Sequence, residues 1–74
     1  MNDVLTMVAR TTRSVAVINT RTGQTQRIFS VDGEITSGPN VAGNIGSVIV
    51  KNNGKLKAYN YDLQKLTVKS IYSV

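Results

Sequence analysis

Lysine and tyrosine side chains gather near the C-terminus at a spacing that could serve nucleic-acid binding. Alternation along a strand over residues 55–61 places two lysines and two tyrosines on one face. A return strand over residues 65–72 carries two further lysines on one of its faces. Basic groups that follow phosphates, combined with aromatic rings that stack on bases, suit single-stranded nucleic acid. The candidate interaction face consists of Lys55, Lys57, Tyr59, Tyr61, Lys65 and Lys69.

A structural interpretation of the same hairpin competes with this one. In it, Leu56, Ala58, Leu66 and Val68 face the core, and the lysines are ordinary solvent-exposed charges. The two tyrosines are then amphipathic residues of the surface or of an interface, a setting that aromatic side chains suit. We favour the structural interpretation and keep nucleic-acid binding as the alternative.

The chain is poorly equipped for catalysis or metal binding. It has no histidine to act as a general base, and no cysteine or histidine to hold zinc. Asp32 and Glu34 flank Gly33, and a solvated turn explains this pair better than a catalytic carboxylate dyad. The sequence therefore predicts a protein that is not an enzyme and has no metal site and no cofactor.

Length and composition predict one small domain that gains stability by association. The 74 residues form a single all-β domain spanning 1–74, and a domain of this size buries only about 60% of its unfolded surface. Without cysteines it has no disulfides, which leaves oligomerisation as the expected source of extra stability. The net charge of +5 is dispersed along the chain, and no apolar stretch approaches the roughly 18 residues of a membrane span.

Short β-strands separated by turns account for almost the whole chain. β-Branched residues dominate, and Asp32-Gly33 and Asn53-Gly54 are strong turn signals. The last three strands form an antiparallel meander. The expected strands cover residues 4–10, 14–20, 24–31, 34–36, 47–51, 55–61 and 65–72.

The stretch from residue 37 to 46 is rich in small residues and glycine, and it allows two interpretations. It could be a long surface loop, although ten residues without structure are many for so small a domain. It could instead be the innermost strand of a propeller blade, where small side chains let neighbouring backbones approach. The sequence leaves both open.

One segment of the chain echoes another. The tetrapeptide 28–31, Ile-Phe-Ser-Val, returns as Ile-Tyr-Ser-Val at 71–74, a shift of 43 residues. The runs that precede the two copies align Asn19 with Asn60, a shift of 41, so the match needs a two-residue gap in a turn. A period of about 40 to 45 residues built from short strands is typical of propeller blades.

On these residues the chain resembles a β-propeller protein. Residues 35–74 look like one blade, with a small inner segment followed by three strands, and residues 15–31 look like the outer part of a second blade. The Gly-His and Trp-Asp pairs of the WD40 type are absent. The resemblance implies blade-like sheets that are completed by homo-oligomerisation. The alternative fold is a small barrel of the SH3-like or OB type.

The function expected from the sequence is structural. We expect a non-catalytic module that self-associates and forms part of a larger assembly together with other proteins. In style the compact, strand-rich sequence without cysteine or histidine is similar to minor virion proteins of bacteriophages. That similarity implies a place in a virion, where the basic face could meet packaged DNA or an acidic partner.

Overall fold

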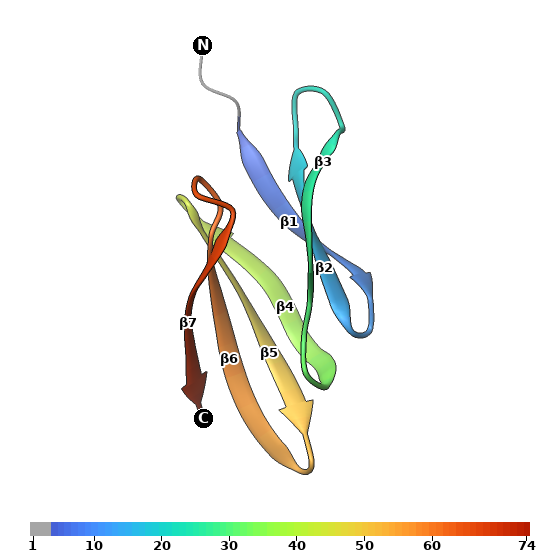
Figure 1. The fold of residues 1–74 in the computed structure, drawn as a ribbon, viewed down its shortest axis with the longest axis vertical. Coiled ribbons are helices and arrows are strands. Elements are labelled where there is room, and N and C mark those ends of the chain that lie inside the picture. Colours follow the sequence, from blue (N-terminus) through green and yellow to red (C-terminus); the bar gives the residue numbers. More distant parts are fainter. Residues whose placement is uncertain (1–3) are drawn as a thin grey trace.

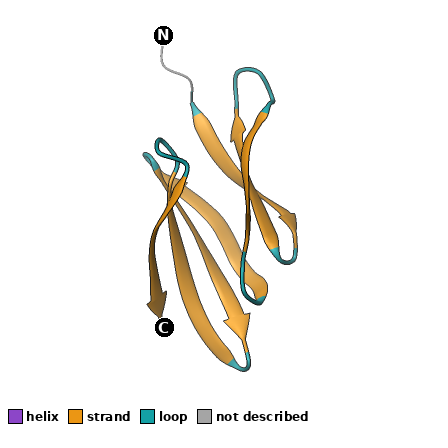
Figure 2. Cartoon of the chain, viewed as in Figure 1, coloured by secondary structure: helices purple, strands orange, loops and turns teal. Residues whose placement is uncertain are grey.

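The protein, described here from a computed structural model of residues 4–74, is built entirely from β-strands and turns. Each of the seven expected strands appears, with shifted ends, and the strands form two antiparallel meanders, one of the first three strands and one of the last four (Figures 1 and 2). The strands are β1 (Leu5–Thr11), β2 (Ser14–Asn19), β3 (Thr25–Ser30), β4 (Glu34–Ala42), β5 (Ile45–Asn52), β6 (Lys55–Asp62) and β7 (Thr67–Ser73).

The strands divide into two sheets. A three-stranded sheet has the order β1-β2-β3, and a four-stranded sheet has the order β4-β5-β6-β7. The sheets do not close into a barrel, so the SH3-like or OB-type alternative is wrong. The connection from β3 to β4 is short because Gly33 adopts φ 137°, and its missing Cβ allows close approach to the carbonyl oxygen of Lys51.

The stretch whose structure the sequence left open is a strand. β4 runs from Glu34 to Ala42 and pairs with β5, so the interpretation as a long surface loop is wrong. Its pairing is interrupted between Ile35 and Ser37 and again between Ser37 and Asn40. Such β-bulges bend a strand and leave extra residues unpaired. The small residues of β4 therefore form an irregular edge strand beside β5.

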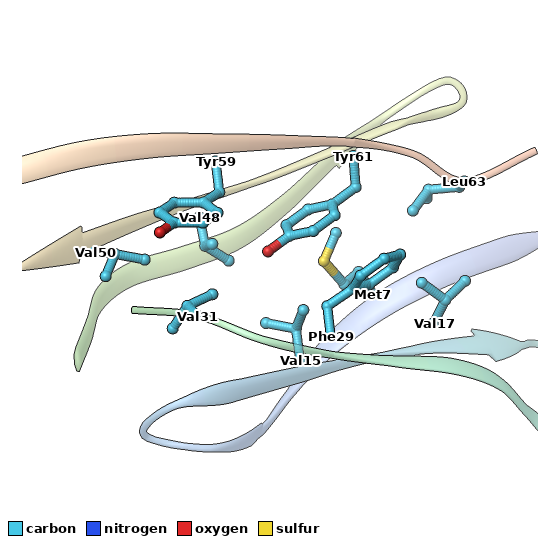
Figure 3. Packing of buried hydrophobic residues seen from close by; sticks show 10 residues of the cluster. All are labelled: Met7, Val15, Val17, Phe29, Val31, Val48, Val50, Tyr59, Tyr61 and Leu63. Atoms are coloured by element: carbon cyan, nitrogen blue, oxygen red, sulfur yellow. The ribbon is translucent and has the colours of Figure 1, made fainter. Parts of the chain in front are cut away.

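The core lies between the two sheets, as Figure 3 shows. The ring centroids of Phe29 on β3 and Tyr61 on β6 are 4.5 Å apart and join the two layers. Tyr59 lies beside Tyr61 at a centroid distance of 6.4 Å. The buried cluster consists of Met7, Val15, Val17, Phe29, Val31, Val48, Val50, Tyr59, Tyr61 and Leu63.

Candidate interaction surface

The structure does not assemble the candidate face that the sequence suggests. Tyr59 and Tyr61 are buried between the sheets, and only 1% of Tyr61 is exposed. Neither ring is available to stack on a base, and neither is the surface residue that the structural interpretation expected. Alternation placed the two tyrosines correctly on one face of β6, but this is the face that the three-stranded sheet covers.

The residues expected in the core are correspondingly displaced. Leu56 is 38% exposed and Val68 is also exposed, whereas Ala58 is only half-buried. Leu66 packs against the edge of the core, within a turn where its φ is 57°. The expected orientation of β6 was therefore wrong, because alternation separates two faces without indicating which one is covered.

The four lysines of the candidate face divide into two groups. Lys55 and Lys57 lie at the beginning of β6, beside the turn from β5, and Lys57 is half-buried. Lys65 lies in the turn after the end of β6, and Lys69 lies where the pairing of β6 with β7 shifts register. At about 3.3 Å per residue along β6, Lys55 and Lys65 are roughly 20 Å apart. The lysines do not form one cluster.

The turn between β6 and β7 is organised by an acidic side chain. The Asp62 Oδ1 atom accepts hydrogen bonds from the backbone N–H groups of Gln64 and Lys65, both at 3.0 Å. The hydrogen bond from Lys65 is the largest cause that lowers the pKa of Asp62, and the charges of Lys65 and Lys69 add to it. These lysines therefore lie near a carboxylate of their own chain.

Tyr61 carries a buried hydroxyl group that makes no hydrogen bond. Within residues 4–74, its oxygen is the one buried side-chain polar atom without a partner. Burial raises the pKa of Tyr61 to about 12, and the neighbouring Tyr59 adds to the shift. The hydroxyl faces the apolar core, so it is a local cost to stability.

The surface that best fits a binding role is the outer face of the four-stranded sheet, defined as the face turned away from the three-stranded sheet. Cross-strand pairs place Ile49, Ala58 and Tyr72 in one row across this face. Tyr72 on β7 is 61% exposed, and Leu56 and Val74 lie beside the row. Contiguous exposed apolar side chains of this kind mark interaction sites.

A hydrogen-bonded polar row runs beside these apolar residues. The Ser47 hydroxyl donates to the Asn60 Oδ1 atom at 2.6 Å, and the Asn60 amide donates to the Ser70 Oγ atom at 3.3 Å. These contacts satisfy the polar side chains within the sheet. The outer face therefore combines an apolar row, exposed at Tyr72, with a polar row whose groups already have partners.

The three-stranded sheet also has an uncovered face. We call it the distal face, because it points away from the four-stranded sheet. Val8, Ala16 and Ile28 lie in one row across it, with Val8 and Ile28 exposed and Ala16 buried between them. Both ends of the two-layer molecule therefore carry an apolar row.

Two grooves provide little for chemistry. One of about 550 Å³ runs between β1 and β4, from Ala9 to Thr12 and from Ile35 to Gly38. The other lies at the turns around Gly33, where Arg13 and Glu34 approach to 3.9 Å as an exposed ion pair. Within residues 4–74 no three potential metal ligands come together, and no helix has the length and apolar character to cross a membrane.

Sequence reasoning missed Tyr72 as a surface residue. It lies in the second copy of the echoed tetrapeptide, and that echo was the signal that could have singled it out. Among residues 4–74, Tyr72 has the most exposed aromatic ring, and it lies on the outer face of the four-stranded sheet. Comparisons of the chain with family models, with curated proteins and with solved structures find no match.

Proposed function

We propose that this chain is a non-catalytic structural module that associates with further copies of itself and forms part of a larger assembly. The observation that carries the proposal is the outer face of the four-stranded sheet, where the exposed Tyr72 ring stands in one row with the half-buried Ala58 and Ile49. A large exposed ring beside apolar side chains loses contact with water when a second protein covers it.

The limited core supports the same proposal. Ten buried residues form the cluster between the sheets, and the chain has no cysteine with which to add a disulfide. A small domain without disulfide or metal commonly reaches its stability by oligomerisation. Burying the outer and distal faces would extend the apolar interior beyond the two sheets.

The free strand edges also support self-association. β7 forms one edge of the four-stranded sheet, and Val68, Ile71 and Tyr72 on it are exposed. An apolar edge strand invites pairing or covering by another chain. A virion is the kind of assembly to which the sequence resemblance points, and there the module would contact copies of itself and other assembly proteins.

Analytical ultracentrifugation of the wild type and of two matched variants tests this proposal. Tyr72→Glu places a charge on the outer face, whereas Val41→Glu places the same charge at an exposed apolar position on the opposite face of the same sheet. We expect the wild type and Val41→Glu to sediment as oligomers and Tyr72→Glu to dissociate. A wild type that sediments as a monomer at every concentration, or a Tyr72→Glu variant that assembles like the wild type, overturns the proposal.

Nucleic-acid binding is the weaker alternative. Its two stacking residues, Tyr59 and Tyr61, are buried, and its four lysines lie in two separate groups. The dispersed net charge of +5 can attract nucleic acid through phosphates alone. That attraction is sequence-independent and needs no dedicated face.

A further inference from the structure

We infer that copies of this chain meet head to tail, with the outer face of the four-stranded sheet in one copy packed on the distal face of the three-stranded sheet in the next. This inference rests on the proposed self-association and specifies its geometry. In the contact, Tyr72 takes the place that Phe29 takes between the two sheets of one chain.

The first support is the position of the echoed tetrapeptides in the fold. Residues 28–31 form the end of β3 and its exit, and residues 71–74 form the end of β7 and its exit. Each strand is the last strand of its sheet and has a free edge. β3 and β7 also run in the same direction in Figure 1. The echo therefore relates two strands with the same place in their sheets.

The second support is the hydrogen bonding of the two copies. The Val31 N–H donates to the Arg13 carbonyl at 2.9 Å, and the Val74 N–H donates to the Leu56 carbonyl at 2.9 Å. In antiparallel pairs the direction of the backbone groups alternates along the strand. Phe29 and Tyr72, each two residues earlier, therefore also direct their backbone groups toward the inner neighbouring strand.

It follows that the two rings project from equivalent faces of their sheets. Because side chains alternate together with the backbone groups, Phe29 and Tyr72 have the same orientation relative to strand direction and neighbouring strand. Yet Phe29 points into the interface between the sheets, whereas Tyr72 points away from it. The two sheets are therefore stacked in the same orientation. The outer face of the four-stranded sheet corresponds to the face of the three-stranded sheet that carries Phe29.

Cross-strand rows show the same relation over whole faces. In the fold the strand pairings match at a shift of 43 residues, in place of the shift of 41 that aligned Asn19 with Asn60. The pair Val15 and Phe29 in the first sheet thus corresponds to the pair Ala58 and Tyr72 in the second. On the opposite faces, the pair Ala16 and Ile28 corresponds to Tyr59 and Ile71 at the same shift. The distal face is therefore the counterpart of the face that receives Phe29.

Side-chain size fits this pairing. Inside the chain the Phe29 ring packs on a face that carries two large rings, Tyr59 and Tyr61. At the shift of 43 residues, Tyr61, which the Phe29 ring contacts, corresponds to Ile18, and Tyr59 corresponds to Ala16. Ala16 and Ile18 are both smaller than tyrosine, so the distal face leaves more room for the phenol of Tyr72 than the face that carries the two tyrosines.

The contact joins two different surfaces, so it is heterologous. A heterologous contact produces a ring if the rotation between copies closes, and a filament if it does not. In either case every copy uses one outer face and one distal face. This requirement distinguishes the arrangement from a symmetric dimer, in which two outer faces meet.

A complementation experiment with two variants tests the arrangement. Tyr72→Glu blocks the outer face and leaves the distal face intact, whereas Ile28→Glu blocks the distal face at a 46% exposed position and leaves the outer face intact. Circular dichroism first establishes that both variants fold. We expect each variant alone to sediment as a monomer and an equimolar mixture to give a 1:1 dimer, with Val41→Glu assembling like the wild type.

The outcomes separate this inference from the proposed function. A wild type that is always monomeric overturns both. An oligomeric wild type whose Ile28→Glu variant still assembles fully overturns the head-to-tail contact and leaves self-association standing. A mixture of the two monomeric variants that stays monomeric also overturns the contact. The outer face of Ile28→Glu would then fail to bind the distal face of Tyr72→Glu.

Discussion

The terminal methyl group of Met7 fills the space beside Gly46 in which any other residue would have its Cβ. Met7 on β1 is buried, and the Leu63 Cδ2 atom lies 3.3 Å from the same point. The absence of a side chain at Gly46 thus lets β1 of one sheet approach β5 of the other. This contact is one of the places where the two layers fit together.

Gly46→Ala is therefore expected to destabilise the protein. The new methyl group displaces a buried thioether, and overpacking of this kind costs about 1–3 kcal/mol. Chemical denaturation at a fixed protein concentration measures the change. Combining Gly46→Ala with Met7→Leu, which removes the clashing methyl group, should give a smaller loss than the sum of the two single changes. Strictly additive losses would contradict the described contact.

Tyr61→Phe is expected to leave the free energy of unfolding unchanged or to raise it by about 1 kcal/mol. The substitution removes a buried hydroxyl that has no partner, and such a group costs desolvation energy without compensation. The ring and its contact with Phe29 remain. Tyr59→Phe serves as the control from the same strand. A Tyr61→Phe variant that is less stable than Tyr59→Phe would indicate that the hydroxyl has a partner.

Stability is expected to fall in alkaline solution because of the same residue. Burial raises the pKa of Tyr61 from 10.0 to about 12, so the folded state keeps its proton where the unfolded state has lost it. The titration of Tyr61 therefore leaves the free energy of unfolding unchanged below pH 10.0 and lowers it as the pH rises toward about 12. Denaturation curves across this window measure the loss, which should be smaller in Tyr61→Phe. If the free energy of unfolding fell equally steeply with pH in the wild type and in Tyr61→Phe, the raised pKa of Tyr61 would be contradicted.

Oligonucleotide binding is expected to depend on total charge alone. Lys55→Ala and Lys65→Ala should each weaken binding at low salt no more than Arg10→Ala, which removes the same charge from β1. The reason is that the lysines of the hairpin lie at opposite ends of β6. Fluorescence anisotropy over a salt series measures the slope. A larger loss of oligonucleotide binding in the two lysine variants than in Arg10→Ala would contradict this and support a nucleic-acid interface on the hairpin.

The sequence located the strands well because their local signals agree. Asn53-Gly54 lies in a turn and Asp32-Gly33 in the bend between β3 and β4, and the runs between them are β-branched or alternating. The 37–46 stretch stayed open because glycine and proline weaken the strand signal, whereas pairing with β5 makes most of it a strand in the fold. That outcome depends on a neighbour that local propensity does not include.

The candidate site could not be predicted to the same extent. Alternation grouped Lys57 with Tyr59 and Tyr61 correctly, but one end of that face lies near a turn and the other under the second sheet. Burial of a face depends on which sheet packs on it, and this is a tertiary property. The echo around Tyr72 was visible in the sequence, yet its significance appears only from the strand edges and hydrogen bonds.

The most direct test of self-association is the molar mass of the wild-type chain, measured by light scattering after size-exclusion chromatography over a dilution series. Covering the apolar outer face predicts a mass of several chains that persists on dilution, with Tyr72 protected from solvent. A folded protein that elutes with the mass of one chain at every concentration would contradict the central claim.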